Sequence, residues 1–149
     1  MNDAIRKDSK IFRNLDSYVY QTTDTIRFQD IDRNNHVNNI AFAVYGETGR
    51  TNFVDHLFEE FGDKIEFVVA RLVVDYFKQA YFPGAVEIGT AVYKVGTKSC
   101  TLIQGIFCKG ECIGTSETVW VYYNRKEDHS EVVPDDVRAL LEKYQIKPQ

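Results

Sequence analysis

The sequence predicts an α+β fold in which a curved antiparallel sheet of about five strands wraps one long central helix. Residues 39–61 repeat their apolar side chains with a helical period, whereas the segments on either side are rich in β-branched and aromatic residues. Short turns separate the last four strand-like segments, which predicts antiparallel neighbours. A long, largely apolar helix has to be buried, and a sheet curled around it achieves this with few elements.

The length, charge and composition of the chain limit the classes of protein to which it could belong. With 149 residues it is expected to form a single domain, 1–149, and its net charge of −4 gives no global support for a nucleic-acid partner. Residues 1–14 are charged and lack the apolar core of a signal peptide, and no apolar run reaches membrane-spanning length. We therefore expect a cytoplasmic protein without membrane insertion. The three cysteines and three histidines form no zinc-binding pattern, so no metal site is predicted.

The first elements are an N-terminal arm and a strand. Residues 1–16 have the composition of a flexible or loosely packed arm. Residues 18–28 contain Tyr, Val, Thr and Ile without a breaker, which predicts the first strand.

The long helix is predicted over 39–61, with Gly62 as its C-terminal stop. Gly46 and Gly49 lower helix propensity, which suggests that another part of the backbone approaches closely there. Glu47 and Thr51 project into the apolar arc, so Glu47 is expected near the core with a hydrogen-bonding partner. The arc itself consists of Ile40, Ala43, Val44, Val54, Leu57, Phe58 and Phe61.

The remaining chain is mostly strand. Strands are predicted over 65–77, 85–95, 100–108 and 112–124, with turns at 96–99 and 109–111. Residues 134–144 begin with Pro-Asp-Asp and continue with apolar residues at helical spacing, which predicts a short C-terminal helix.

The junction between the first strand and the helix, residues 28–39, carries the chemistry. Its sequence, Phe-Gln-Asp-Ile-Asp-Arg-Asn-Asn-His-Val-Asn-Asn, combines two carboxylates, an imidazole and several carboxamides. Asn or Asp can cap the helix, and a carboxylate beside the exposed N–H groups of a helix start is a minimal hydrolytic site. A polar loop with an N-cap explains the same residues equally well.

This junction resembles that of the hotdog-fold thioesterases, the 4-hydroxybenzoyl-CoA thioesterase group and its acyl-CoA thioesterase relatives. The likeness lies in Phe28-x-Asp-x-Asp32-x-x-x-His36-Val-Asn-Asn39, and it extends over residues 18–125. The helix with Glu47 and Arg50, Val-Asp-Tyr at 74–76, Pro-Gly at 83–84 and the turn at 96–99 support it. Many relatives have Gly where this chain has Asn35, and Asn is the next most tolerant residue of left-handed backbone.

The resemblance implies a fold, a site and an assembly. Asp32 would be the catalytic carboxylate, the backbone N–H of Asn39 would polarise the thioester carbonyl, and His36 and Asn38 would line the site. Glu47 is the fallback carboxylate. Relatives form homodimers with two active sites at the subunit interface, often paired into tetramers. They use no metal or redox cofactor, and a coenzyme A thioester is the substrate.

Substrate contacts are assigned on weaker grounds. Lys98 and Ser99, with Arg71 and Lys94 nearby in the sheet, are the candidates for the phosphates of coenzyme A. Their alternative is ordinary solvated side chains. The aromatic residues Phe42, Tyr45 and Tyr76 are candidates for an apolar acyl pocket, although core packing explains aromatic residues as well.

Three functions remain open. The first is an acyl-CoA thioesterase in which Asp32 acts as general base or as nucleophile. The second is a hotdog dehydratase or hydratase, which also uses a carboxylate with a histidine. The third is a non-catalytic acyl-CoA-binding module. The Asn38-Asn39 helix start favours the thioesterase.

Overall fold

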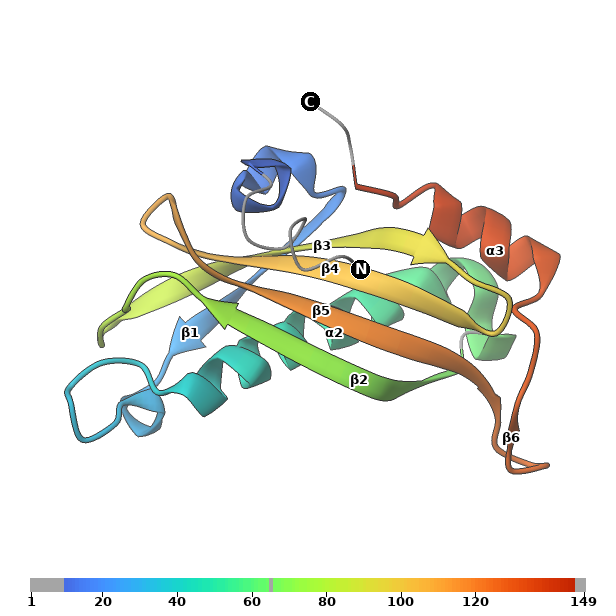
Figure 1. The fold of residues 1–149 in the computed structure, drawn as a ribbon, viewed down its shortest axis with the longest axis horizontal. Coiled ribbons are helices and arrows are strands. Elements are labelled where there is room, and N and C mark those ends of the chain that lie inside the picture. The colour runs from blue at the N-terminus through green and yellow to red at the C-terminus, as the bar shows by residue number, and fades with distance from the viewer. Residues whose placement is uncertain (1–9, 65, 147–149) are drawn as a thin grey trace.

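The computed structural model describes residues 10–64 and 66–146. One long helix lies across a strongly curved antiparallel sheet, with a short helix at the far end (Figure 1). The strands are β1 (Tyr20–Ile26), β2 (Phe67–Tyr76), β3 (Gly84–Val95), β4 (Ser99–Cys108), β5 (Glu111–Asn124) and the short β6 (His129–Ser130); the helices are α2 (Asn39–Phe61) and α3 (Asp135–Glu142). Four short 3-10 helices are η1 (Lys10–Arg13), η2 (Leu15–Ser17), η3 (Phe28–Asp30) and η4 (Gly62–Lys64). The predicted α+β architecture is confirmed.

The order of strands in the sheet differs from the expected one. The order is β1-β3-β4-β5-β2, so β2 pairs with β5 at one edge and is separated from β3 by two strands. The prediction of four successive neighbours is therefore wrong for β2. Its connection to β3, residues 77–83, is no tight turn: at roughly 3.3 Å per residue it reaches on the order of 23 Å, more than the ~14 Å of three strand spacings. This crossing segment passes beside the polar junction, where the Val37 N–H donates to the Ala80 carbonyl oxygen at 2.8 Å.

The bounds of α2 match the prediction. Asn38 is the N-cap, and its side-chain oxygen accepts from the Ala41 N–H at 2.8 Å. Gly62 ends the helix with a positive φ of 58°, a conformation that glycine adopts without steric cost.

The face of α2 that meets the sheet coincides only in part with the predicted apolar arc. Leu57 is buried, and Val54 and Phe61 pack against the same core cluster. Ile40, Val44 and Phe58 are exposed, and so is Glu47. The buried charged side chain is Arg50, which is 8% exposed. The buried residues recur mainly every four positions and are Ala41, Phe42, Tyr45, Gly46, Gly49, Arg50, Phe53 and Leu57.

The absence of a side chain at Gly49 explains why this face of α2 packs against the sheet. A Cβ added at Gly49 would lie 2.6 Å from Ile88 Cγ2 and 2.7 Å from Gln104 Nε2, so the helix backbone touches β3 and β4 there. The close approach predicted from Gly46 and Gly49 is confirmed at Gly49. With Gly49 against the sheet, Ile40, Val44 and Phe58 of the predicted arc are left exposed.

A polar layer divides the core beneath the middle of α2. Gln104 Nε2 donates to the Gly46 carbonyl oxygen and to Thr90 Oγ1, both at 3.0 Å, while Arg50 Nη1 donates to Gln104 Oε1 and Thr118 Oγ1, both at 3.2 Å. On one side of this layer lies an apolar cluster around Phe53 and Trp120, and on the other lies a cluster around Phe42, Tyr45 and Ile106.

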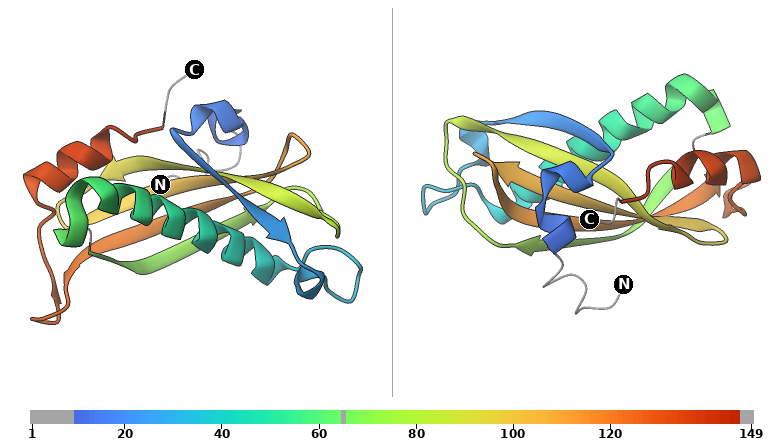
Figure 2. Two further views of the ribbon diagram at one scale, coloured as in Figure 1. Left: turned by 180° about the vertical axis from the view of Figure 1, so that it is seen from behind. Right: turned by 90° about the horizontal axis from the view of Figure 1, so that it is seen from above.

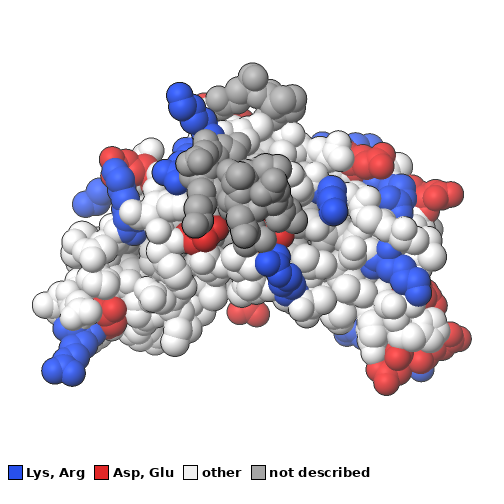
Figure 3. Space-filling view, in the orientation of Figure 1, with Lys and Arg blue, Asp and Glu red and all other residues white. Residues whose placement is uncertain are grey.

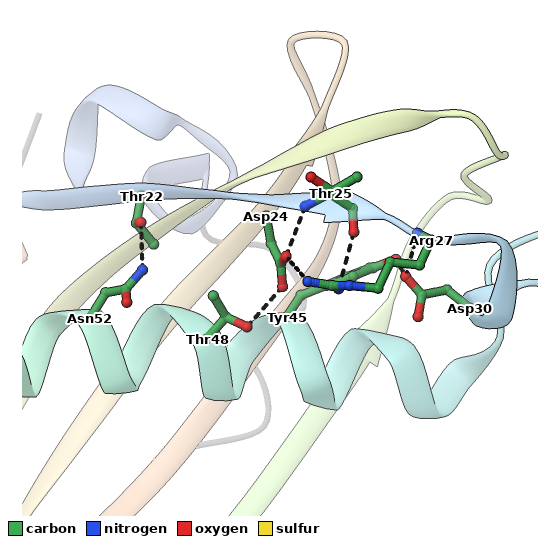
Figure 4. Close-up of polar contacts among 8 residues, drawn as sticks. All are labelled: Thr22, Asp24, Thr25, Arg27, Asp30, Tyr45, Thr48 and Asn52. Atoms are coloured by element: carbon green, nitrogen blue, oxygen red, sulfur yellow. Dashed lines mark hydrogen bonds and ion pairs between the residues drawn. The ribbon is translucent and has the colours of Figure 1, made fainter.

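Hydrogen bonds join α2 to β1 along one flank. Thr48 donates to Asp24 at 2.8 Å, and Asn52 donates to Thr22 at 2.8 Å (Figure 4). Asp24 also accepts from Arg27 Nη2 at 2.7 Å. Burial acts to raise the pKa of Asp24, but the hydrogen bonds from Arg27, Thr48 and the Thr25 N–H outweigh it, and the pKa is lowered.

The two ends of the described chain pack on the sheet. Phe12 of η1 is buried, so residues 10–16 are packed more closely than the loose arm expected from their composition; residues 1–9 lie outside the described residues. The C-terminal helix packs over β3 and the end of α2, as the view from behind shows (Figure 2). On the face in Figure 3, basic and acidic side chains are interspersed. No helix among the described residues is long and apolar enough to cross a membrane.

Candidate active site

The polar junction folds into a tight loop in front of α2. The Asp32 N–H donates to the His36 carbonyl oxygen at 3.0 Å, and the Asn35 N–H donates to the Asp32 carbonyl oxygen at 3.1 Å. Asn35 has a φ of 63°, the left-handed conformation expected of the residue that replaces glycine there. The loop therefore closes on itself with Asp32 and His36 at its two ends.

The side chains of Asp32 and His36 face each other. Asp32 Oδ2 lies 3.7 Å from His36 Nδ1, and Asp32 Oδ1 accepts from the Asn34 N–H at 2.7 Å. Both side chains are partly exposed, at 29% and 20%. His36 Nδ1 also lies 3.3 Å from the Val37 carbonyl oxygen, so a proton on Nδ1 can be donated to that oxygen, leaving Nε2 as the acceptor nitrogen of the ring.

The start of α2 offers a backbone donor. The Asn38 side chain caps the Ala41 N–H, whereas Asn39, as the first helical residue, has no intrahelical acceptor for its N–H. Tyr76, at the end of β2, donates its hydroxyl to the Asn39 carbonyl oxygen at 3.1 Å and packs edge-on against Phe42 at 5.1 Å. The N–H of Asn39 therefore sits at the positive end of the helix dipole, beside an aromatic wall.

A cleft of about 510 Å³ opens at this helix start. His36 and Asn39 line it together with residues of the crossing segment, so three parts of the chain meet there: the loop, the helix start and the connection from β2 to β3. The lining residues are His36, Asn39, Phe42, Tyr76, Phe77, Lys78, Gln79 and Tyr81.

Two other residues of the junction and helix have structural contacts. Asp30 is 7% exposed and accepts from the Arg27 N–H at 2.8 Å and from the Tyr45 hydroxyl at 2.7 Å. These contacts give Asp30 a structural role in the junction. Tyr45 is fully buried and does not line the cleft, so its assignment to an acyl pocket is wrong; burial and the bond to Asp30 raise its pKa.

The candidates for phosphate binding lie elsewhere in the chain. Lys98 and Ser99 are at the β3–β4 turn, with Lys94 close by on β3. The start of α2 and the end of β2, whose residues line the cleft, are at the opposite end of the sheet (Figure 1). Ser99 pairs with Val121 of β5 and Tyr76 pairs with Gly114 of the same strand, a separation of about 23 Å along the strand. Arg71 is ion-paired with Glu117 at 3.0 Å. A single chain thus brings together Asp32, His36, Asn38, Asn39, Phe42 and Tyr76, but not Arg71, Lys94, Lys98 or Ser99.

A second cavity, about 230 Å³ in volume, lies between α2 and β2 and was not predicted from the sequence. Arg50 and the fallback carboxylate Glu47 line it, with an apolar wall that includes Trp120. It is lined by Glu47, Arg50, Thr51, Val54, Phe67, Val69, Trp120 and Arg125. The sequence feature that could have indicated this cavity is the four-residue spacing of Gly46 and Arg50, which places both on the buried face of α2.

Three chelating side chains also meet at the β5–β6 hairpin. The ligand atoms of Glu127, His129 and Glu131 lie within 4.8 Å of one another, and His129 Nε2 is 2.8 Å from Glu127. Glu127 lies in the turn before β6, His129 is the first residue of β6, and Glu131 directly follows the strand. Glu127 and the Ser130 carbonyl oxygen raise the pKa of His129. Glu127 and His129 are exposed and Glu131 is half-buried; His56 is exposed as well.

Comparisons with known proteins identify the family. A profile of the Thioesterase-like superfamily matches residues 26–141. Among solved structures, a predicted thioesterase from Bacillus stearothermophilus is 27% identical with a TM-score of 0.78, over 87% of this chain and 98% of that one. A thioesterase from Thermus thermophilus, solved with coenzyme A and zinc, is 23% identical with a TM-score of 0.78, over 89% and 98%.

A Staphylococcus aureus protein solved with CoA is 16% identical, with a TM-score of 0.74 over 87% of both chains. A comparison with curated proteins gave no match. Because the family profile spans most of the chain and the solved structures share its fold, the protein belongs to the Thioesterase-like superfamily and has the hotdog fold.

Proposed function

We propose that the protein is an acyl-CoA thioesterase, which hydrolyses a thioester to a free acid and coenzyme A. The observation that carries this proposal is the cleft at the start of α2: His36 and Asn39 line it, and Asp32, which does not itself line it, has its Oδ2 3.7 Å from His36 Nδ1. Relatives solved with coenzyme A support the substrate class.

The proposed reaction uses the helix start and the carboxylate in separate roles. Attack on the thioester carbonyl puts negative charge on its oxygen, and the Asn39 N–H at the positive end of the helix dipole stabilises that charge. Asp32 either takes a proton from the attacking water or attacks the carbonyl itself, which gives a mixed anhydride that water opens. His36, 3.7 Å from Asp32, orients the carboxylate or the water.

We also infer a homodimer as the functional form. β2 forms one edge of the sheet, and its apolar side chains Val68, Val69 and Leu72 are 38–52% exposed. A long apolar edge strand left to solvent favours pairing with another chain. Antiparallel pairing of two β2 strands about a two-fold axis would extend the sheet and bring the exposed residues of both α2 helices to the same side. Assembly of two dimers into a tetramer is compatible with this interface.

Thiol release from a panel of acyl- and aroyl-CoA substrates tests the function. Wild-type protein should release thiol, and Asp32→Asn should lower the rate by about 10²–10⁴-fold because it removes the base or nucleophile. Asp30→Asn is the matched control for loss of a junction carboxylate, read together with its thermal stability because Asp30 is buried. Equal slow rates for wild type and Asp32→Asn on every substrate would contradict the catalytic assignment.

Two alternatives give different readings in the same experiment. A dehydratase or hydratase would change the conjugated absorbance of an enoyl thioester without releasing thiol. A binding module would bind acyl-CoA saturably without turnover, and Asp32→Asn would leave that binding unchanged. The carboxylate beside the cleft favours hydrolysis, because binding alone does not require a negative charge next to a thioester.

A further inference from the structure

The cavity between α2 and β2 contains a buried cation without a counter-ion. Arg50 is 8% exposed, and its two hydrogen bonds go to the neutral acceptors Gln104 and Thr118. Within residues 10–64 and 66–146, no carboxylate lies within 4.0 Å of its guanidinium. Burial lowers the pKa of Arg50, while the charge of Glu47 acts to raise it. Guanidinium stays charged in proteins, and a buried charge is costly unless an opposite charge meets it.

The residues that line the cavity determine which kind of ligand could pair with the charge of Arg50. Phe67 and Trp120 stack at 5.2 Å, and together with Val54 and Val69 they make one wall apolar. The charged side chains in the lining are Arg50, Arg125 and Glu47, which sum to one positive charge. Apolar cavities of about 150 Å³ accommodate a ligand the size of benzene, so about 230 Å³ suits a compact organic group.

We propose that this cavity binds a carboxylate that carries a compact apolar body, with the carboxylate paired to Arg50. A single carboxylate balances the net charge of the lining, and its two oxygens match the fork of a guanidinium. The apolar body packs on Phe67 and Trp120. A long acyl chain exceeds the volume, and a neutral group leaves the buried cation unpaired.

The cavity relates to the active site through the proposed dimer. If two β2 strands pair antiparallel, the Phe67 end of one lies beside the Tyr76 end of the other, with both helices on the same face of the sheet. The cavity of one copy then opens toward the Asn39 cleft of its partner. This step rests on the proposed function and dimer: the carboxylate is then either the distal group of an acyl chain held for hydrolysis, or that of a free acid.

The first experiment measures binding directly. Trp120 is the one tryptophan of the 149-residue chain and lines the cavity, so its fluorescence reports on occupancy. Hexanoate and benzoate should change this fluorescence saturably, whereas hexanamide and benzamide, which match them in shape without the charge, should not. Arg50→Gln should weaken acid binding about tenfold or more, and Lys126→Gln, an exposed cation outside this cavity, should not.

A second variant covers the case in which Arg50→Gln does not fold. Thr51 is exposed on α2 and lines the cavity, so Thr51→Phe fills the space without touching the polar layer, and it should also weaken binding about tenfold. Amides that bind as tightly as the acids overturn the proposal. So does unchanged acid binding by Thr51→Phe.

A kinetic comparison distinguishes the two sources of the carboxylate. If the acyl group supplies it, kcat/KM for glutaryl-CoA should exceed that for valeryl-CoA about tenfold, and Arg50→Gln or Thr51→Phe should remove the preference. If a free acid supplies it, the acids bind but the two thioesters are cleaved alike. Acid binding with no cleavage of any thioester would refute the thioesterase and leave the carboxylate site standing.

Discussion

The two flanks of α2 are built differently. Toward β1 the helix is joined by side-chain hydrogen bonds from Thr48 to Asp24 and from Asn52 to Thr22. Toward β2, among the described residues, the one hydrogen bond between side chain and helix is from Tyr76 to Asn39 at the helix start, and beyond it the cavity with Arg50 separates the two elements. The sheet thus has one edge that its own helix secures and one edge that it leaves exposed.

This difference indicates where the molecule is complete on its own. On the β1 side, polar groups find partners within the chain. On the β2 side, apolar strand residues are exposed, and the buried guanidinium of Arg50 has neutral hydrogen-bond acceptors but no counter-ion among the described residues. Buried polar groups and long apolar edges are normally satisfied in a working assembly, so the β2 side is where a ligand or a second copy is expected to act.

Among the substitutions on and around α2, the largest effect is expected at the helix start that both flanks share. Asn39→Pro removes the backbone N–H, while proline is tolerated at the first helical position and the extended backbone of Asn38 (φ −73°, ψ 159°) suits a residue before proline. We expect kcat for thioester hydrolysis to fall about 10²–10³-fold, the effect of losing one oxyanion donor. Asn39→Ala keeps the N–H and should retain most activity; equal losses in both variants would exclude the backbone role.

A smaller effect is expected where the helix touches the sheet. Gly49→Ala places a Cβ 2.6 Å from Ile88, which should lower the free energy of unfolding by about 1–3 kcal/mol. At Gly46 the nearest atoms are 3.3–3.5 Å away, so the gain in helix propensity should make Gly46→Ala neutral or mildly stabilising. Chemical denaturation of both variants measures this, and a similar cost at the two positions would contradict the close approach at Gly49.

The exposed edge should respond to charge in a way that the secured edge does not. Leu72→Lys places a charge on β2 and should raise the dimer dissociation constant about tenfold or more, because pairing would bury that charge. Thr23→Lys is the matched substitution at an exposed position of β1 and should leave assembly unchanged. Sedimentation at several protein concentrations measures the dissociation constants of both variants. A dimer that is weakened only by Thr23→Lys would place the interface at β1 and contradict pairing through β2.

The smallest expected effect is the pH dependence of the β1 flank. Because hydrogen bonds lower the pKa of Asp24, its contribution to stability is complete above the ordinary carboxyl pKa and is lost as the pH falls below about 4. Asp24→Asn should cost about 1 kcal/mol at pH 7 and less at pH 3, because protonation at low pH removes the advantage of the carboxylate. Unfolding measured at both values tests this, with Asp55→Asn on the exposed surface of α2 as control.

Local patterns were sufficient to predict most elements of the fold. The bounds of α2 follow from its cap, its period and Gly62, and β3, β4 and β5 follow from alternating runs between tight turns. The position of β2 in the sheet could not be predicted in this way, because no residue between Tyr76 and Gly84 indicates which strand β2 pairs with. The buried face of α2 was predicted only in part, since hydrophobicity ranks Val44 above Gly49, while packing against Ile88 favours the residue without a side chain.

The two candidate sites differ in the same way in how far they can be predicted from the sequence. Asp32, His36, Asn38 and Asn39 are neighbours in sequence, so one motif places them together. The cavity at Arg50 needs α2, β2 and β5 at once, and its members are scattered from residue 47 to residue 125. Composition cannot reveal such a site, because each member taken singly is an ordinary core or surface residue.

The cap of α2 has an electrostatic consequence. Aspartate and asparagine cap helices about equally well, yet at Asn38 an amide oxygen binds the Ala41 N–H. An aspartate there would set a permanent anion one residue from the donor that awaits a second anion, and the two would repel. The neutral Asn38 cap satisfies the N–H of Ala41 and leaves the attraction between the N–H of Asn39 and an incoming negative oxygen undiminished.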